Sequence, residues 1–89
     1  MIQWRQNAPK WVQVADILKA RIADGTYPPD TPLPSEHRLV QEFGPEFSRG
    51  TARKVLTRLR EEGVAYSVRG LGTFVAGTEG GASDRRGEG

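Results

Sequence analysis

The sequence has no cysteine and a single histidine, His37. A chain without cysteine has neither a disulfide framework nor a thiolate metal site, and one histidine does not make a multi-histidine metal site. The pattern also shows no nucleophile–base pair and no carboxylate dyad. We therefore expect a protein that is not an enzyme, with no catalytic residue, no metal ligand and no cofactor.

Long apolar runs are missing as well. No stretch approaches the ~20 apolar residues of a transmembrane helix, and the N-terminus lacks the hydrophobic region of a signal peptide. The 89 residues are enough for one small domain. These features predict a soluble, cytoplasmic protein without a membrane partner.

Net charge is low, but positive charge is concentrated in one stretch. The chain has 13 Lys and Arg against 11 Asp and Glu, a formal net charge of +2. This concentration is typical of a nucleic-acid-binding surface, although a solvated helix face has the same composition. Between Ser48 and Gly70 only Glu61 and Glu62 oppose the basic residues Arg49, Arg53, Lys54, Arg58, Arg60 and Arg69.

A first helix is predicted at residues 9–24. Pro9 suits the first turn of a helix, where its missing N–H does no harm, and Gly25 supplies the stop. The apolar positions repeat at helical spacing, which indicates a helix with one buried face. They are Trp11, Val14, Ala15, Leu18 and Ile22.

The segments around that helix have a different character. Residues 1–8 are mostly polar, and we expect a flexible N-terminal arm. Residues 26–34 contain four prolines and cannot continue a helix. A short second helix is then predicted from the N-cap Ser35 to Gly44.

A third helix is predicted at residues 48–62. Ser48 is a favourable N-cap, and Gly63 ends the helical pattern. The buried face does not need the basic residues, which are therefore available for an outward role. That face consists of Ala52, Val55, Leu56 and Leu59.

The C-terminal third predicts a hairpin and a tail. Residues 64–68 and 73–75 have strand character, and the glycine-rich turn 69–72 joins them. Residues 77–89 are glycine-rich and polar, so we expect a disordered tail. The predicted fold is mainly α with a small β-hairpin, a winged helix-turn-helix of three helices and a two-stranded wing. A short helical adaptor with a hairpin is the alternative.

On this fold, the start of the third helix faces the major groove of DNA. Arg49 and Arg53 lie one turn apart, and each has the planar fork that pairs with guanine O6 and N7. Gly50 between them has two interpretations: close approach of the backbone to DNA, or simple tolerance of glycine in a first turn. Arg49 and Arg53 are thus the predicted base-reading residues.

The remaining contacts are predicted to position the domain. Ser48 and Thr51 can bind phosphate at the helix N-terminus, where the helix dipole favours anions. Lys54 is interpreted as a phosphate contact or a solvated charge. Arg69 and Gly70 at the tip of the wing suit an adjacent minor groove, whose negative potential attracts arginine. The alternative is that Arg69 is an exposed turn arginine that binds nothing.

Three runs together resemble the DNA-binding domain of GntR-family transcriptional regulators: LPSEHRLVQEFG, SRGTARKVLTRLREEGV and RGLGTFV. The resemblance covers residues 9–76 and implies a bacterial, cytoplasmic protein that associates with the nucleoid when bound to DNA. It implies DNA contacts at His37, Ser48, Arg49, Gly50, Thr51, Arg53, Arg69 and Gly70.

The chain departs from the family pattern at several positions. His37 stands where arginine is usual, which predicts a weaker and pH-dependent phosphate contact. Gly50 stands where threonine is usual, and Asp30 occupies a turn position where glycine is usual. The turn before Ser48 is about two residues longer than the common pattern.

The predicted function is sequence-specific binding of double-stranded DNA, with transcriptional repression the expected result. Helix 48–62 would occupy the major groove and wing 69–72 the minor groove of an inverted-repeat operator. Family members carry an effector-binding, dimerising C-terminal domain that is not visible here. A stand-alone regulator or a truncated one is therefore expected, as a weak homodimer or as a dimer formed on DNA. The alternative is a protein-interaction adaptor without DNA binding, anchored by Trp4, Tyr27 or Tyr66.

Overall fold

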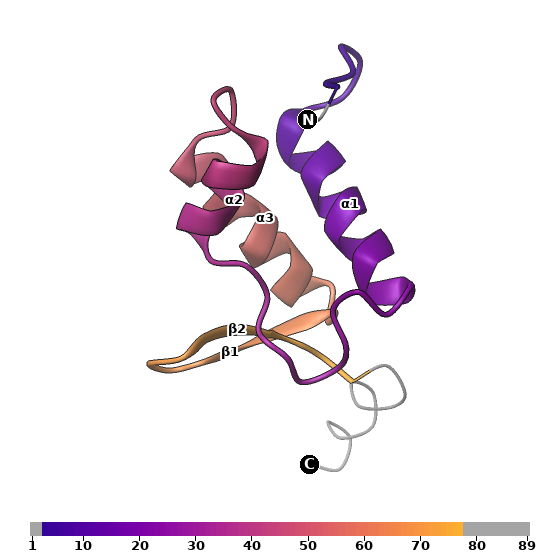
Figure 1. The fold of residues 1–89 in the computed structure, drawn as a ribbon, viewed down its shortest axis with the longest axis vertical. Helices are drawn as coiled ribbons and strands as arrows, with labels where there is room; N and C mark the ends of the chain where they lie inside the picture. The colour runs from indigo at the N-terminus through magenta and orange to yellow at the C-terminus, as the bar shows by residue number, and fades with distance from the viewer. Residues whose placement is uncertain (1–2, 78–89) are drawn as a thin grey trace.

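A computed structural model of the chain describes residues 3–77. Three helices pack together above an antiparallel hairpin, which closes one end of the molecule (Figure 1). The predicted winged helix-turn-helix is therefore confirmed, while the predicted tail lies outside the described residues from position 78 onward. The elements are α1 Lys10–Ala23, α2 Glu36–Phe43, α3 Arg49–Glu61, β1 Ala65–Val68 and β2 Gly72–Val75.

Helix α1 matches the predicted segment to within one residue at each end. Pro9 occupies the N-cap position with extended backbone angles, and not the first helical turn as predicted. After Asp24 the chain turns through Gly25, whose φ of +88° lies in the left-handed region that favours glycine. The buried face includes Val14, Ala15 and Leu18.

Helix α2 is short and capped as predicted. The Ser35 hydroxyl accepts a hydrogen bond from the Arg38 N–H at 3.2 Å. The helix ends at Gly44, where a Cβ would meet the Val40 carbonyl oxygen at 2.6 Å, so the fold requires glycine there. Eight residues are too few for a stable isolated helix, and α2 depends on packing its buried Leu39 and Phe43 side chains.

Helix α3 packs against both other helices and the hairpin. The Ser48 hydroxyl accepts a hydrogen bond from the Thr51 N–H at 3.1 Å, which confirms the predicted N-cap. The predicted apolar stripe is buried along the whole helix, so the opposite face is left for solvent or a partner. The stripe consists of Ala52, Val55, Leu56 and Leu59.

The wing is a two-stranded sheet extended at one edge by the proline-rich connection. Ala65 pairs with Val75 and Val68 with Gly72 across the strands. On the other side of β2, the Leu33 N–H donates to the Thr73 carbonyl at 2.8 Å. This pairing anchors the wing beneath the helices and buries Leu33 in the core.

The N-terminal residues 3–8 are attached to the domain, whereas the sequence predicts a flexible arm. Trp4 stacks on the buried Phe47 with ring centroids 6.1 Å apart. Gln13 is only 5% exposed; its amide donates to the carbonyls of Arg5 and Ala8 and accepts the Arg5 N–H. Within residues 3–77, no helix has the length and apolar character to cross a membrane.

Candidate nucleic-acid interface

The exposed face of α3 presents two arginines at its N-terminal end. Arg49 and Arg53 are separated by four residues, so their side chains lie on the same face about one turn apart. Their side chains are 67% and 68% exposed. The structure therefore places both predicted base-reading residues outward on α3.

Glu36, the first residue of α2, is bound to both arginines. Its carboxylate accepts from Arg53 Nε at 3.0 Å and from Arg53 Nη2 at 3.5 Å. The same carboxylate lies 3.5 Å from Arg49 Nη2. The hydrogen bond from Arg53 lowers the pKa of the Glu36 carboxyl below its ordinary value, and the positive charges of Arg53 and Arg49 add to this effect.

The sequence interpretation missed this role of Glu36. The sequence did contain a signal for this contact. Glu36 is an acidic residue in the first turn of α2, and only a short turn separates α2 from the basic N-terminal end of α3. An ion pair with exposed partners contributes little to stability, because water and salt screen it. The main consequence of the contact is geometric, because one carboxylate restrains two long, otherwise mobile side chains.

Ser48 and Thr51 lie together at the start of α3. Their hydroxyl oxygens are 2.9 Å apart, in addition to the capping bond from the Thr51 N–H to Ser48 Oγ. The hydroxyl groups of both residues are therefore hydrogen-bonded within the first turn of α3. Because the helix dipole is positive at this end, the site still favours an anion such as phosphate.

Gly50 is not required by the packing of the described residues. A Cβ at this position would meet only Ser48 Oγ, at an ordinary 3.9 Å. Glycine in a helix nevertheless costs about 1 kcal/mol relative to alanine. Gly50 also lines a groove of about 440 Å³ between α1 and α3, together with Trp11 and Lys54. Packing therefore does not explain the glycine at this position.

Lys54 has an intramolecular neighbour that the sequence did not predict. Its Nζ lies 5.1 Å from the centre of the Trp11 ring, and the Arg58 guanidinium lies 5.9 Å from the same ring. Arg58 also pairs with Glu62 at 3.1 Å. Lys54 thus joins α3 to α1 and remains exposed.

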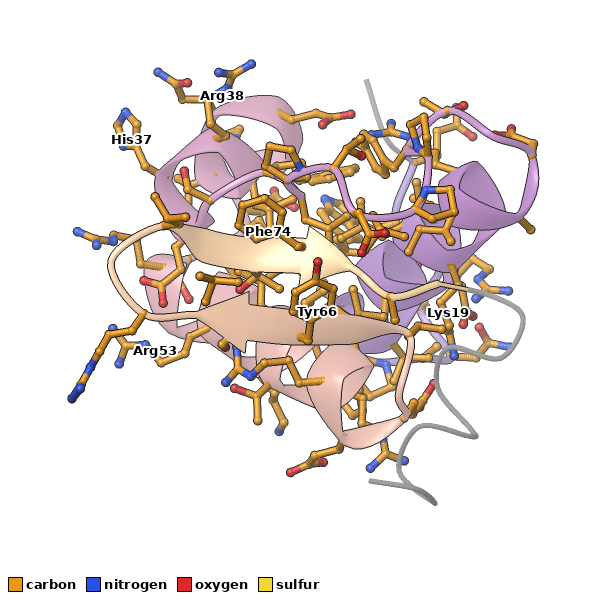
Figure 2. All side chains as sticks on the ribbon, turned by 90° about the horizontal axis from the view of Figure 1, so that it is seen from below. Lys19, His37, Arg38, Arg53, Tyr66 and Phe74 are labelled. Carbon is orange, nitrogen blue, oxygen red and sulfur yellow. The ribbon has the colours of Figure 1, made fainter. Side chains whose placement is uncertain are left out.

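The wing turn and the start of α2 meet at one cleft. In Figure 2, His37, Arg38 and Arg53 project at the end of the molecule where the two strands join. A cleft of about 360 Å³ lies between this turn and the helices, and its walls include His37, Arg49 and Leu71. Arg69 is exposed at the same turn.

The two strands are joined at the glycine-rich turn, as the sequence predicts. Gly70 adopts a φ of +81°, a conformation that other residues rarely accept. The structure therefore places the predicted contacts in four neighbouring groups that overlap. They are the cleft with the wing and His37, which Arg49 also lines, the arginine pair held by Glu36, the Ser48–Thr51 cap, and the groove with Gly50 and Lys54, which Arg53 also lines.

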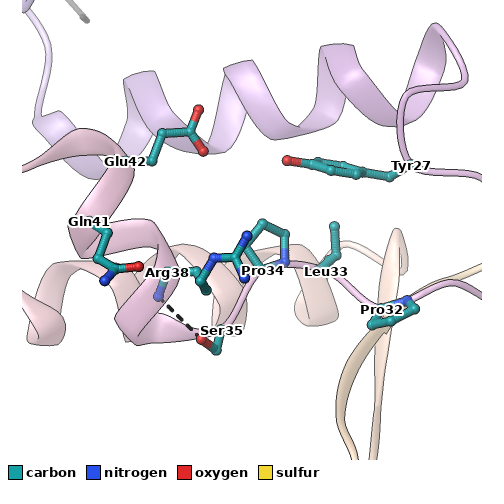
Figure 3. A pocket seen from close by; sticks show the side chains of 8 residues that line it. All are labelled: Tyr27, Pro32, Leu33, Pro34, Ser35, Arg38, Gln41 and Glu42. Atoms are coloured by element: carbon teal, nitrogen blue, oxygen red, sulfur yellow. Dashed lines mark hydrogen bonds between the residues drawn. The ribbon is translucent and has the colours of Figure 1, made fainter.

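A hollow of about 650 Å³ lies apart from these contacts (Figure 3). It is bounded by the proline-rich connection and α2, and none of the predicted contact residues lines it. At one side Arg21 pairs with Glu42 at 2.6 Å and donates to the Tyr27 hydroxyl at 2.9 Å. The hydrogen bond to Glu42 raises the pKa of Arg21, so this arginine stays charged.

The three aromatic anchors of the adaptor alternative are placed differently from one another. Trp4 and Tyr27 are partly buried against the core, and Tyr66 is the most exposed of the three, at 38%. Tyr66 stacks on Phe74 and donates to Asp30 at 2.8 Å. All three proposed anchors therefore make contacts within the fold itself.

Comparison with known protein families agrees with the winged helix-turn-helix fold described above. A family model described as bacterial regulatory proteins, gntR family, matches residues 10–75. The chain belongs to the GntR family. Among relatives of this GntR-family chain, the HTH-type transcriptional repressor NagR of Bacillus subtilis is 43% identical over 68 residues, which is 76% of this chain and 27% of NagR. The arabinose metabolism transcriptional repressor of Geobacillus stearothermophilus is 37% identical, over 80% of this chain and 19% of that protein.

Solved structures show the same fold. The DNA-binding domain of AraR in complex with operator ORR3 superposes with a TM-score of 0.70 at 38% identity, covering 85% of this chain and 94% of that domain. A GntR-family regulator from Listeria monocytogenes has a TM-score of 0.75 at 25% identity, covering 82% and 62%. This GntR-family chain spans only about a fifth to a quarter of the two repressors named above.

Proposed function

We propose that this GntR-family domain binds double-stranded DNA sequence-specifically and acts in transcriptional repression. The observation that supports this most directly is the arginine pair: Arg49 and Arg53 project from the start of α3, and Glu36 holds both. Further support comes from relatives named as repressors and from the AraR domain bound to its operator.

In the proposed complex, α3 occupies the major groove with its N-terminal end nearest the bases. Arg49 and Arg53 each have five N–H donors, and the contacts with Glu36 use only some of them. The remaining donors are available for guanine O6 and N7. Because Gly50 has no side chain, it allows the helix to approach the base edges closely.

The other residues position the domain on the DNA backbone. Ser48 and Thr51 face a phosphate at the positive end of the α3 dipole. His37 on α2 and Lys54, on the side of α3 that faces α1, contact phosphates of the two strands. Arg69 and Gly70 place the wing in the adjacent minor groove.

One domain contacts only a few base pairs, so specific regulation requires two domains on an inverted repeat. The two copies associate either as a weak dimer in solution or only on the operator. Sedimentation of the free domain, compared with its stoichiometry on a selected operator, distinguishes these two modes.

The test compares arginine variants on a duplex selected from random sequence and on a scrambled duplex. Arg49→Ala and Arg53→Ala should each reduce the specificity ratio by about tenfold or more, because a bidentate guanine contact contributes about 1–3 kcal/mol of discrimination. Arg60→Ala is the matched control, since it removes the same charge from the last turn of α3.

The contribution of charge to DNA affinity is measured separately, from the dependence of affinity on salt concentration. The logarithm of the affinity should fall linearly with the logarithm of salt concentration, by about 0.9 per neutralised phosphate. If Arg49→Ala and Arg53→Ala behave like Arg60→Ala on both duplexes, the base-reading assignment is wrong. An affinity that does not respond to salt argues against DNA binding and in favour of a protein-interaction adaptor.

A further inference from the structure

The tip of the wing exposes a leucine that the fold does not use. Leu71 is 71% exposed, the more exposed of the two large apolar side chains on the surface of residues 3–77. We propose that Leu71 packs against the sugars of the DNA minor groove and makes the domain prefer A·T over G·C pairs beneath the wing. This inference rests on the proposed DNA binding and adds a specificity-determining residue to it.

Backbone contacts hold Leu71 at this position. Its N–H donates to the Val68 carbonyl at 2.9 Å and closes the turn. The flanking Gly70 and Gly72 have φ values of +81° and +117°, so the tip is formed by backbone conformations that glycine provides. The turn would close equally well with a small or polar side chain at position 71, and packing does not explain the leucine.

The cleft beside Leu71 has two chemically different walls. On the helix side it presents His37 and Arg49, and on the wing side it presents Leu71 and Thr73. Glu36 also borders the cleft, but Arg49 and Arg53 neutralise its charge. The two arginines outweigh the single carboxylate, so the cleft combines a positively charged helix wall with a wing wall that carries an aliphatic side chain.

A DNA strand has the complementary arrangement. With α3 in the major groove and the wing in the next minor groove, one strand passes between them. Its phosphates are the natural partners of the basic wall, while the CH groups of its deoxyriboses line the minor groove beside the wing. Burial of a leucine side chain against such CH groups is favourable, in proportion to the apolar area removed from water.

The proposed base preference follows from the shape of the minor groove. A G·C pair adds the guanine 2-amino group to the groove floor, whereas an A·T pair has only recessed acceptors. The amino group would keep an aliphatic side chain from approaching closely. Runs of A·T pairs also narrow the groove, which brings both sugar walls nearer to an inserted side chain.

The test uses the full chain and three versions of a selected duplex that differ only at the base pairs beneath the wing. These pairs are A·T, G·C or inosine·C, which lacks the 2-amino group. Wild type should bind the A·T and inosine·C duplexes alike and the G·C duplex about five- to tenfold more weakly, a discrimination typical of one contact. Leu71→Ala and Leu71→Ser should reduce this ratio to about two, and Leu71→Met should retain it.

Salt dependence separates Leu71 from the neighbouring charge. Leu71→Ala should lower affinity for the A·T duplex without changing the salt slope, because no ionic contact is lost. Arg69→Ala should reduce the slope by about one. Melting temperatures equal to wild type are expected for the Leu71 variants, since substitution of an exposed residue rarely changes stability.

Two results would overturn the inference. One is an unchanged A·T to G·C ratio in Leu71→Ala. The other is an affinity loss seen on the inverted repeat but not on a single half-site, which would assign Leu71 to a contact between two copies of the chain. Both results leave the proposed function intact. Equal binding of wild type to selected and scrambled DNA would instead remove the proposed function itself.

Discussion

At the scale of single residues, the central feature is one carboxylate that holds two guanidinium groups. Glu36 lies at the start of α2, and its partners Arg49 and Arg53 belong to the first two turns of α3. Free arginine side chains lose considerable rotamer entropy when they bind a base. Because Glu36 already restrains both side chains, part of that loss occurs during folding and not during DNA binding.

We expect Glu36→Gln to lower specificity while raising non-specific affinity. The variant retains the shape of the side chain but loses the ion pairs with Arg49 and Arg53, and it removes a negative charge from the proposed DNA face. Affinity for scrambled DNA should rise about two- to threefold, and the ratio of selected to scrambled affinity should fall about fivefold, because the two arginine side chains must then be ordered on binding.

Fluorescence anisotropy with labelled duplexes measures both affinities. Glu46→Gln is the charge-matched control, because Glu46 pairs with Lys10 at 3.6 Å and does not contact the arginine pair. An equal rise in both affinities for Glu36→Gln would show that Glu36 acts only as a repulsive charge and does not orient the arginines.

At the scale of elements, the N-terminal segment and the turn before α3 support each other. The turn between α2 and α3 places Phe47 in the core, 1% exposed, with its ring edge-on to Phe43 at 5.7 Å. Trp4 covers the outer side of Phe47, and Gln13 on α1 holds the backbone that carries Trp4. The start of α3 is thus braced from α1 as well as from α2.

We expect Gln13→Leu to destabilise the domain by about 1–3 kcal/mol. The substitution leaves the carbonyls of Arg5 and Ala8 and the Arg5 N–H without their side-chain partner in a partly buried setting. Chemical denaturation followed by circular dichroism gives the free energy of unfolding. Gln6→Leu on the exposed part of the segment is the control; equal stability of both variants would show that residues 3–8 do not brace the fold.

At the scale of the whole molecule, several carboxylates of residues 3–77 have lowered pKa values: Glu62 and Glu36 pair with other elements, and Asp24 bonds to Thr26 two residues further on. Glu62 after α3 accepts from Lys19 on α1 at 2.9 Å, and this hydrogen bond is the main cause of its lowered pKa. The pKa of Glu36 is lowered by Arg53, and that of Asp24 by the Thr26 hydroxyl. The folded domain therefore binds protons less tightly at these three groups than the unfolded chain does.

The sign of the pH dependence follows from these lowered pKa values. Their contribution to stability is fully present above the ordinary values of 4.5 for glutamate and 3.8 for aspartate, and it is lost as the pH falls through the lower folded values. We expect a melting temperature that is nearly constant from pH 7 to pH 5 and falls below pH 4.5. Glu62→Gln should make that fall shallower; a melting temperature that rises on acidification would contradict the assignment.

Local sequence determined most of the secondary structure. Ser35 and Ser48 act as the predicted N-caps, and the apolar spacing of α1 and α3 marks their buried faces. Such signals can be recognised in a sequence because capping and helical periodicity involve residues only three or four positions apart. The outward placement of Arg49 and Arg53 follows from the same periodicity.

Tertiary structure alone decided which of these residues meet. Several contacts join separate elements of the chain. Glu36 pairs with Arg53, Trp4 stacks on Phe47, and the Lys54 ammonium lies over the Trp11 ring. Leu71 and His37 line the same cleft. Contacts of this kind depend on how helices cross and on the conformation of tight turns. Local helix and strand propensities do not determine either of these. The sequence therefore determined the elements and the arginine pair, while the packing of α2 against α3 determined how that pair is held.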